Sequence, residues 1–240
     1  MARNTSNNDS AGPFEKVNEQ KHIRAYGEEE RPGEYVEEAV PAYRVGPGGE
    51  RKYTIADYYA FDDDIRRELI DGKFFIMEAP SVIHQVILGE LYILFRECAR
   101  LHEQNCRVLF APCDVQLDRD QYTMVQPDLF VVCDDEKTRK RVIYGAPDLA
   151  VEIMSPSSRS RDSVLKFNKY MRAGVREYWL VDPETRTVLV YLRDADRDGS
   201  GTYKQYSFTD RIPVSISQGK CEVDFSIVSA AIEGIEEQRG

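Results

Sequence analysis

Apolar and polar positions alternate most informatively between residues 147 and 183. Residues 149–154 are apolar on both alternating sets of positions except at Glu152, a pattern typical of a strand buried on both faces. Residues 162–173 carry apolar side chains at helical spacing, and Gly174 suits the left-handed position that ends a helix. Residues 177–181 form a second apolar strand. Strand, helix and strand over about 35 residues predict a βαβ crossover.

The pattern predicts further elements on both sides of this crossover. Asp71-Gly72 between two apolar runs is a strong hairpin signal, and Ser81 precedes a long stretch with one apolar helical face. The other expected elements are a helix at 55–61, a hairpin at 67–70 and 73–78, a long helix at 82–103, strands at 107–110, 114–117, 125–133, 187–193, 203–208 and 211–216, and a short helix ending 223–235. Together they predict an α/β fold with a mixed central β-sheet flanked by helices.

Composition divides the chain near residue 50. Residues 1–50 are rich in Asn, Ser, Gly, Pro and Glu and have little apolar periodicity, so we predict a flexible N-terminal extension followed by one domain at 51–240. An ordered arm used in oligomer formation is the alternative. No apolar run approaches the ~20 residues that span a bilayer. The N-terminus also lacks the apolar segment of a secretory signal, so no membrane partner is expected.

Charge and cysteine content narrow the functional classes. The net charge of −10 argues against general adhesion to nucleic acid, so any phosphate backbone would need a local basic patch. The five cysteines are odd in number, scattered, and contain no CxxC pair. We therefore expect reduced thiols in a cytoplasmic protein.

Two acids are embedded in apolar runs. Asp128 follows Pro127 within the run at 124–133, and Glu152 lies in the strand before the predicted helix. A buried charge is costly unless it is paired or holds a metal. Either acid alone is best explained as a helix cap or as the partner of an arginine. The two together, followed by a lysine-bearing helix, favour a two-carboxylate metal site.

These residues resemble a known group of proteins. Pro127-Asp128 followed by Glu152 resembles the PD-(D/E)XK nuclease superfamily. A longer ordered set resembles the Uma-two family of candidate restriction endonucleases: ELIDG at 68–72, His84, PDL at 127–129, VEIMSPS at 151–157, Asp162, Lys166, Tyr170 and GVREYWLVDP at 174–183. The resemblance covers about residues 53–193 and implies a restriction-endonuclease-like fold.

One motif position departs from the superfamily pattern. Met154 stands where a lysine is expected, two positions after Glu152. The resembling family places this lysine on the next helix, where Lys166 fits. Asp162 and Lys166 are four residues apart and share a helix face. The alternative for Lys166 is a solvated lysine paired with Asp162.

The resemblance implies a metal-dependent endonuclease that hydrolyses phosphodiester bonds in DNA. Asp128 and Glu152 would hold Mg²⁺ or Mn²⁺, with the backbone carbonyl of Ile153 as a further ligand. Lys166 would orient or deprotonate the attacking water. Two more site candidates are Glu68, as an extra ligand or positioning group, and His84, near phosphate or a metal-bound water. Their alternatives are a carboxylate paired with Arg66 or Arg67 and an ordinary histidine at a helix start.

Partners follow from the same hypothesis. Basic side chains surround the predicted helix, and we expect Arg159, Arg161 and Lys169 to contact the DNA backbone. A homodimer is expected by analogy, because cutting two strands suits two sites. A catalytically inactive nuclease-fold module that binds nucleic acid or a protein partner remains the alternative, since Met154 and the acidic charge favour it. A structural dimer with its acids locked in salt bridges is the third reading.

Overall fold

A computed structural model describes residues 52–101, 105–118, 120–155, 162–194 and 201–236. All of them belong to one compact unit, Val45–Gly240. The predicted extension at 1–50 lies outside the described residues and stays a prediction, as does the boundary near residue 50.

A six-stranded mixed sheet forms the centre of the domain, in the order β10-β9-β8-β7-β5-β3. Its strands are β3 (Arg107–Phe110), β5 (Leu129–Val132), β7 (Leu149–Ile153), β8 (Glu177–Asp182), β9 (Thr187–Arg193) and β10 (Gly201–Ser207). Strands β7 and β8 are parallel and are joined by helix α3 (Asp162–Ala173), whereas the other neighbours are antiparallel. The predicted βαβ crossover and mixed α/β fold are therefore confirmed.

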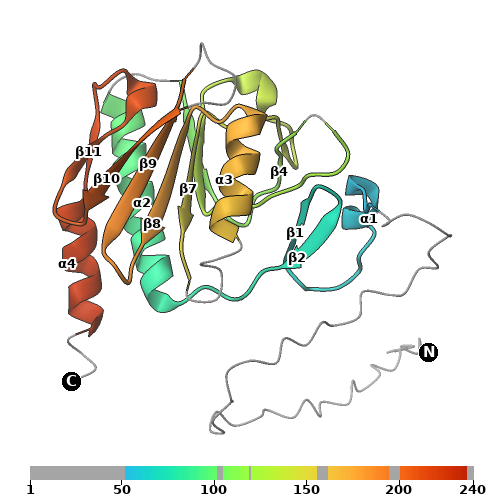
Figure 1. Ribbon diagram of the computed structural model, residues 1–240, viewed down its shortest axis with the longest axis horizontal. Coiled ribbons are helices and arrows are strands. Elements are labelled where there is room, and N and C mark those ends of the chain that lie inside the picture. The colour runs from blue at the N-terminus through green and yellow to red at the C-terminus, as the bar shows by residue number, and fades with distance from the viewer. Residues whose placement is uncertain (1–51, 102–104, 119, 156–161, 195–200, 237–240) are drawn as a thin grey trace, which may run out of the picture. The chain divides into compact units, whose positions relative to one another are not determined.

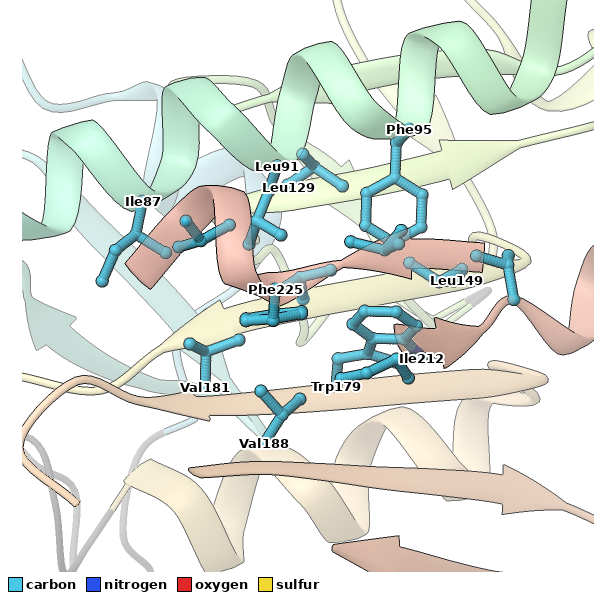
Figure 2. Close-up of a cluster of buried hydrophobic side chains, with 14 of the residues drawn as sticks. Ile87, Leu91, Phe95, Leu129, Leu149, Trp179, Val181, Val188, Ile212 and Phe225 are labelled. Atoms are coloured by element: carbon cyan, nitrogen blue, oxygen red, sulfur yellow. The ribbon is translucent and has the colours of Figure 1, made fainter. Parts of the chain in front are cut away.

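Helices cover both faces of this sheet. Helix α2 (Val82–Leu101) and helix α4 (Phe225–Glu236) pack on one face, and α3 lies on the other (Figure 1). Because successive strand residues point to opposite faces, β7 sends Leu149, Val151 and Ile153 toward α2 and sends Ala150 and Glu152 toward α3. Figure 2 shows the α2 side, where Trp179 packs between Phe95 and Phe225.

Smaller elements complete the domain. Helix α1 (Ile55–Tyr59) begins at Thr54, whose hydroxyl and backbone form a capping box with Asp57. The predicted hairpin is present as β1 (Arg67–Ile70) and β2 (Lys73–Ile76). The remaining elements are β4 (Val115–Gln116), β6 (Ile143–Tyr144), β11 (Arg211–Pro213), β12 (Glu222–Asp224) and the 3₁₀ turns at Asp135–Lys137 and Ser215–Ser217.

The turn of the β1–β2 hairpin has positive φ at both central residues, 52° at Asp71 and 84° at Gly72. This is the backbone geometry that favours Asp-Gly in two-residue hairpins. A Cβ atom at Gly72 would lie 2.7 Å from Cβ of Lys52, so glycine also satisfies a close approach there.

The strand predicted at 125–133 is shorter in the structure. It begins at Leu129, because the preceding residues pair with other partners: Met124 bridges Leu69, and Val125 bridges Val115. Pro127 separates the two pairings and has no N–H for a ladder. Asp128 therefore stands at the entrance of β5 rather than within it.

The cysteine prediction was wrong. The structure contains two disulfides, Cys98–Cys221 and Cys106–Cys133, and leaves Cys113 as a free thiol. Their sequence separations of 123 and 27 residues give no local signal, and the fold alone brings the partners together. The cytoplasmic location, which rested partly on reduced thiols, stays a prediction. Within the described ranges, no helix is long and apolar enough to cross a membrane.

Candidate active site

The two acids singled out from the sequence meet at one end of the β5–β7 pair. These strands are antiparallel with Leu129 opposite Val151, so the next step along the ladder places Asp128 opposite Glu152. Asp128 Oδ2 accepts the backbone N–H of Ile153 at 2.8 Å. This bond fixes the carboxylate where regular strand pairing ends. Ile153 thus contributes its N–H to the site, and its carbonyl as a metal ligand stays a prediction.

Glu152 is buried on the α3 face of the sheet, with 8% of its surface exposed. Its Oε1 accepts the Tyr170 hydroxyl at 2.7 Å, and Nζ of Lys166 lies 3.4 Å from the same oxygen. Lys166 and Tyr170 are four residues apart on α3, so one helix face supplies both groups.

Lys166 is the centre of the charge cluster. It is 8% exposed, and its Nζ lies 2.8 Å from Glu68 Oε2 on β1. The alternative of a solvated lysine is therefore wrong. The sequence-based alternative for Glu68 is also wrong, because Arg66 donates to Gln126 and Arg67 donates to Asp63.

Glu68 is oriented by a second contact. Its Oε1 accepts the backbone N–H of Gln126 at 2.8 Å. The side chain of Gln126 accepts from Arg66 and donates to Tyr58 and Asp114, at 2.9, 3.1 and 3.0 Å. This network links β1 to the residues just before Asp128. Sequence reasoning missed Gln126 because nothing in its local pattern marks it.

His84 reaches the site from the first turn of α2. Its backbone N–H donates to Ser81 Oγ at 3.2 Å, which confirms Ser81 as the residue that opens the helix. Its Nε2 lies 3.1 Å from Asp128 Oδ2. Within the described part of the chain, its buried Nδ1 has no hydrogen-bond partner. One ring nitrogen thus orients the Asp128 carboxylate.

Burial and charge oppose each other in this cluster. The pKa of the Glu152 carboxyl is raised to about 8, mainly by burial. The Lys166 ammonium lowers this pKa, whereas the charges of Asp128 and Glu68 raise it. Burial alone would lower the pKa of Lys166, but the charges of Glu152 and Glu68 hold it well above its usual range. Lys166 is therefore charged at neutral pH.

The donor chemistry fits a hard divalent cation. Three carboxylates, those of Glu68, Asp128 and Glu152, surround one ammonium, so the cluster would carry two excess negative charges if all three were ionised. No group of three or more His, Cys, Asp or Glu side chains within the described ranges is arranged as a ready metal cage. Mg²⁺ does not need one, because it commonly uses one or two carboxylates and keeps several waters.

The three basic residues expected to contact DNA are not gathered at this site in the described structure. Arg159 and Arg161 lie outside the described residues. Lys169 forms ion pairs with Asp71 and Asp118, so two carboxylates already engage its ammonium. Tyr170 entered the sequence argument only through the resemblance; its spacing from Lys166 was the available signal.

Comparison with known proteins gives a family match. A family model described as "Uma2: Putative restriction endonuclease" matches residues 55–221. An uncharacterized protein of Synechocystis sp., slr1290, is 31% identical over 150 residues, covering 61% of this chain and 75% of that protein.

A solved structure has a similar fold. The crystal structure from Anabaena variabilis, titled as a putative nuclease belonging to DUF820, superposes with a TM-score of 0.62 at 18% identity. The match covers 74% of this chain and 98% of that one. At this identity the likeness concerns the fold. The family match spans well over half of the sequence, and the chain therefore belongs to the Uma2 family of restriction-endonuclease-like proteins.

Proposed function

We propose that the protein is an endonuclease that hydrolyses phosphodiester bonds in DNA and requires Mg²⁺ or Mn²⁺. The observation that carries the proposal is the burial of Lys166 between Glu68 and Glu152, beside the Asp128 carboxylate. Within the described residues this buried cluster has three carboxylates and one ammonium. Family membership supports the same chemistry.

Asp128 and Glu152 would hold the cation. When bound, it would neutralise charge on the phosphoryl oxygens and acidify a water. Asp128 is pre-oriented for this role by the N–H of Ile153 and by His84, and Glu152 by Tyr170. These contacts keep both carboxylates in place before a ligand arrives.

Lys166 acts as a hydrogen-bond donor and positive charge. Its raised pKa favours this role over proton abstraction, which requires a neutral amine. Glu68 holds the Lys166 ammonium in place, and Gln126 holds Glu68. The Met154 position gave the main reason to expect an inactive module. Lys166 removes that reason, since it brings an ammonium to Glu152 from α3.

The test is cleavage of supercoiled plasmid by the purified protein with Mg²⁺ or Mn²⁺, together with calorimetric titration of each metal. Asp128→Asn and Glu152→Gln should each abolish cleavage and weaken metal binding, with thermal melting unchanged or improved. Glu97→Gln, at an exposed position on α2, is the matched control. Cleavage that persists in both site variants would contradict the proposal, as would the absence of metal binding.

A homodimer and DNA contacts by Arg159 and Arg161 belong to the same proposal. Sedimentation equilibrium should give twice the chain mass of 27.6 kDa. Arg159→Ala and Arg161→Ala should each weaken DNA binding and flatten its salt dependence. A monomer that cuts both strands would remove the dimer from the proposal without affecting the chemistry.

A further inference from the structure

A hollow of about 330 Å³ lies on the α3 face of the sheet, between α3 and strands β8 and β9. Its walls are mainly apolar and aromatic, and include Met154, Phe167, Leu180, Leu189 and Tyr191. This volume falls at the lower end of the roughly 300–1,000 Å³ typical of small-ligand clefts. We call it the aromatic groove.

Residues that line the aromatic groove neighbour residues of the acid cluster. Leu180 is the cross-strand partner of Glu152, and Met154 lies two residues beyond Glu152 on the same face of the chain. Phe167 directly follows Lys166 on α3. The groove therefore lies next to the positions on β7 and α3 that carry Glu152 and Lys166.

The groove wall offers ring surfaces. The rings of Phe167 and Tyr191 have centroids 4.3 Å apart, and both side chains are only partly buried. Tyr191 pairs across β9–β10 with Tyr203, whose ring lies 5.8 Å away and which is 68% exposed. Aromatic surface thus extends from the groove outward over the edge of the sheet. Rings in such positions stack with the bases of single-stranded nucleic acid.

The charge of the groove favours a nucleobase over a phosphate as its ligand. Among its described lining residues the only charged side chain is Asp182. A carboxylate repels phosphate, so the groove does not suit the nucleic-acid backbone. A flat, uncharged ring with polar edges suits it better. In a regular duplex the bases stack on each other and are not available to a protein groove.

We propose that the aromatic groove binds the nucleobase next to the scissile phosphate, so that the preferred substrate is DNA with an unstacked nucleotide at the cut, as in a single strand. The position of the base next to a cleaved phosphate rests on the proposed nuclease function, whereas the binding of a base in the groove does not.

The test compares the binding of two fluorescein-labelled probes to the full-length protein in a calcium buffer, by fluorescence anisotropy. One probe is oligothymidylate and the other is an abasic chain of equal length and charge. Stacking of one base predicts that the wild-type protein binds oligothymidylate at least about tenfold more tightly. Phe167→Leu and Tyr191→Leu should each reduce this preference to less than about threefold.

Two further variants separate stacking from damage to the fold. Tyr191→Phe keeps the ring and should retain the preference. Tyr144→Leu makes the same change at a partly exposed tyrosine of β6 that does not line the groove, and should also retain it. Equal binding of the two probes by the wild-type protein, or a preference that survives Tyr191→Leu, would overturn the inference. A dimer that dissociates in Tyr191→Leu would also overturn it, because the groove would then hold a second copy.

The two proposals fail in different ways. Plasmid cleavage without any preference for bases would leave the nuclease function standing and refute the groove. A base preference lost in Tyr191→Leu, with no cleavage under either metal, would support the groove and refute the nuclease function.

Discussion

Two buried glutamates lie on neighbouring strands and face opposite sides of the sheet. Glu152 on β7 faces α3, and Glu177 on β8 faces the core with Trp179. Glu177 accepts hydrogen bonds from neutral groups, among them the indole N–H of Trp179 at 2.8 Å and the backbone N–H of Ile216 at 2.9 Å. Glu152 instead contacts a lysine and a tyrosine, and the charges of two further acids act on it.

The difference shows that a buried carboxylate is not by itself a sign of chemistry. Burial raises the pKa of both glutamates. Glu177 has both oxygens used by donors that belong to the fold, so it anchors the turn at Ser215–Ser217. Glu152 belongs to a cluster in which, among the described residues, three carboxylates accompany one ammonium. These charged partners, and not depth, distinguish Glu152 from Glu177.

Loss of Lys166 should have the largest effect on activity. Lys166→Met keeps the aliphatic volume and removes the only ammonium bonded to Glu152 in the described ranges. We expect cleavage to fall by about 10²–10³, the usual result of deleting one charge-stabilising contact. Steady-state cleavage of labelled DNA measures this. Lys140→Met, at an exposed lysine, should leave the rate unchanged; a comparable loss in that control would mean that the effect is general.

Glu177→Gln should have the opposite effect to a substitution in the acid cluster: it should lower stability and retain cleavage activity. Glutamine has one acceptor oxygen, so either Trp179 or Ile216 would lose its partner in the core. The cost of one unsatisfied buried donor is about 1–3 kcal/mol in the free energy of unfolding. Urea titration followed by tryptophan fluorescence measures it. Unchanged stability together with lost cleavage would break the comparison between the two glutamates.

The pH dependence of stability should also distinguish Glu152. Its folded pKa of about 8 exceeds the ordinary 4.5, so the folded state binds more protons than the unfolded chain between these values. The free energy of unfolding contributed by this group therefore falls as pH rises through that window. In Glu152→Gln the free energy of unfolding should fall less steeply with pH. The slope should change by less than about 1.4 kcal/mol per pH unit, which is the value for one proton. Chemical denaturation at pH 5 to 8 measures the slope. An unchanged slope would contradict the charge assignment.

The hydroxyl groups of two stacked tyrosines provide the smallest test. Tyr170→Phe removes the donor to Glu152 Oε1 and should lower kcat/KM by about threefold to tenfold, the effect of one hydrogen bond. Tyr178 stacks on Tyr170 at 5.2 Å, and its buried hydroxyl has no partner in the described structure. Tyr178→Phe is therefore the control and should leave activity intact. Equal losses in both variants would point to packing instead.

Much of the fold was predictable because it follows from local periodicity. The helix at 162–173 and the strand at 187–193 have the same boundaries in the structure as in the prediction. The hairpin at Asp71-Gly72 followed from turn chemistry. The start of β5 and the short strand β6 were missed, because their pairing depends on segments distant in sequence.

The sequence by itself determined that Glu152 faces the opposite side of its strand from Val151 and Ile153, because side chains alternate along a strand. Together with the resemblance, it also identified five side chains that the fold gathers in one cluster: Glu68, His84, Asp128, Glu152 and Lys166.

Only the tertiary structure decided how those side chains are partnered. The contact of Lys166 with Glu68, the support of Glu68 by Gln126 and the two disulfides join segments with no local relation. Periodicity is a property of neighbouring residues, whereas such contacts depend on the packing free energy of the whole domain. A sequence pattern can therefore place a charged side chain on one side of a strand. Its interaction partners depend on how the other segments of the chain pack against that strand.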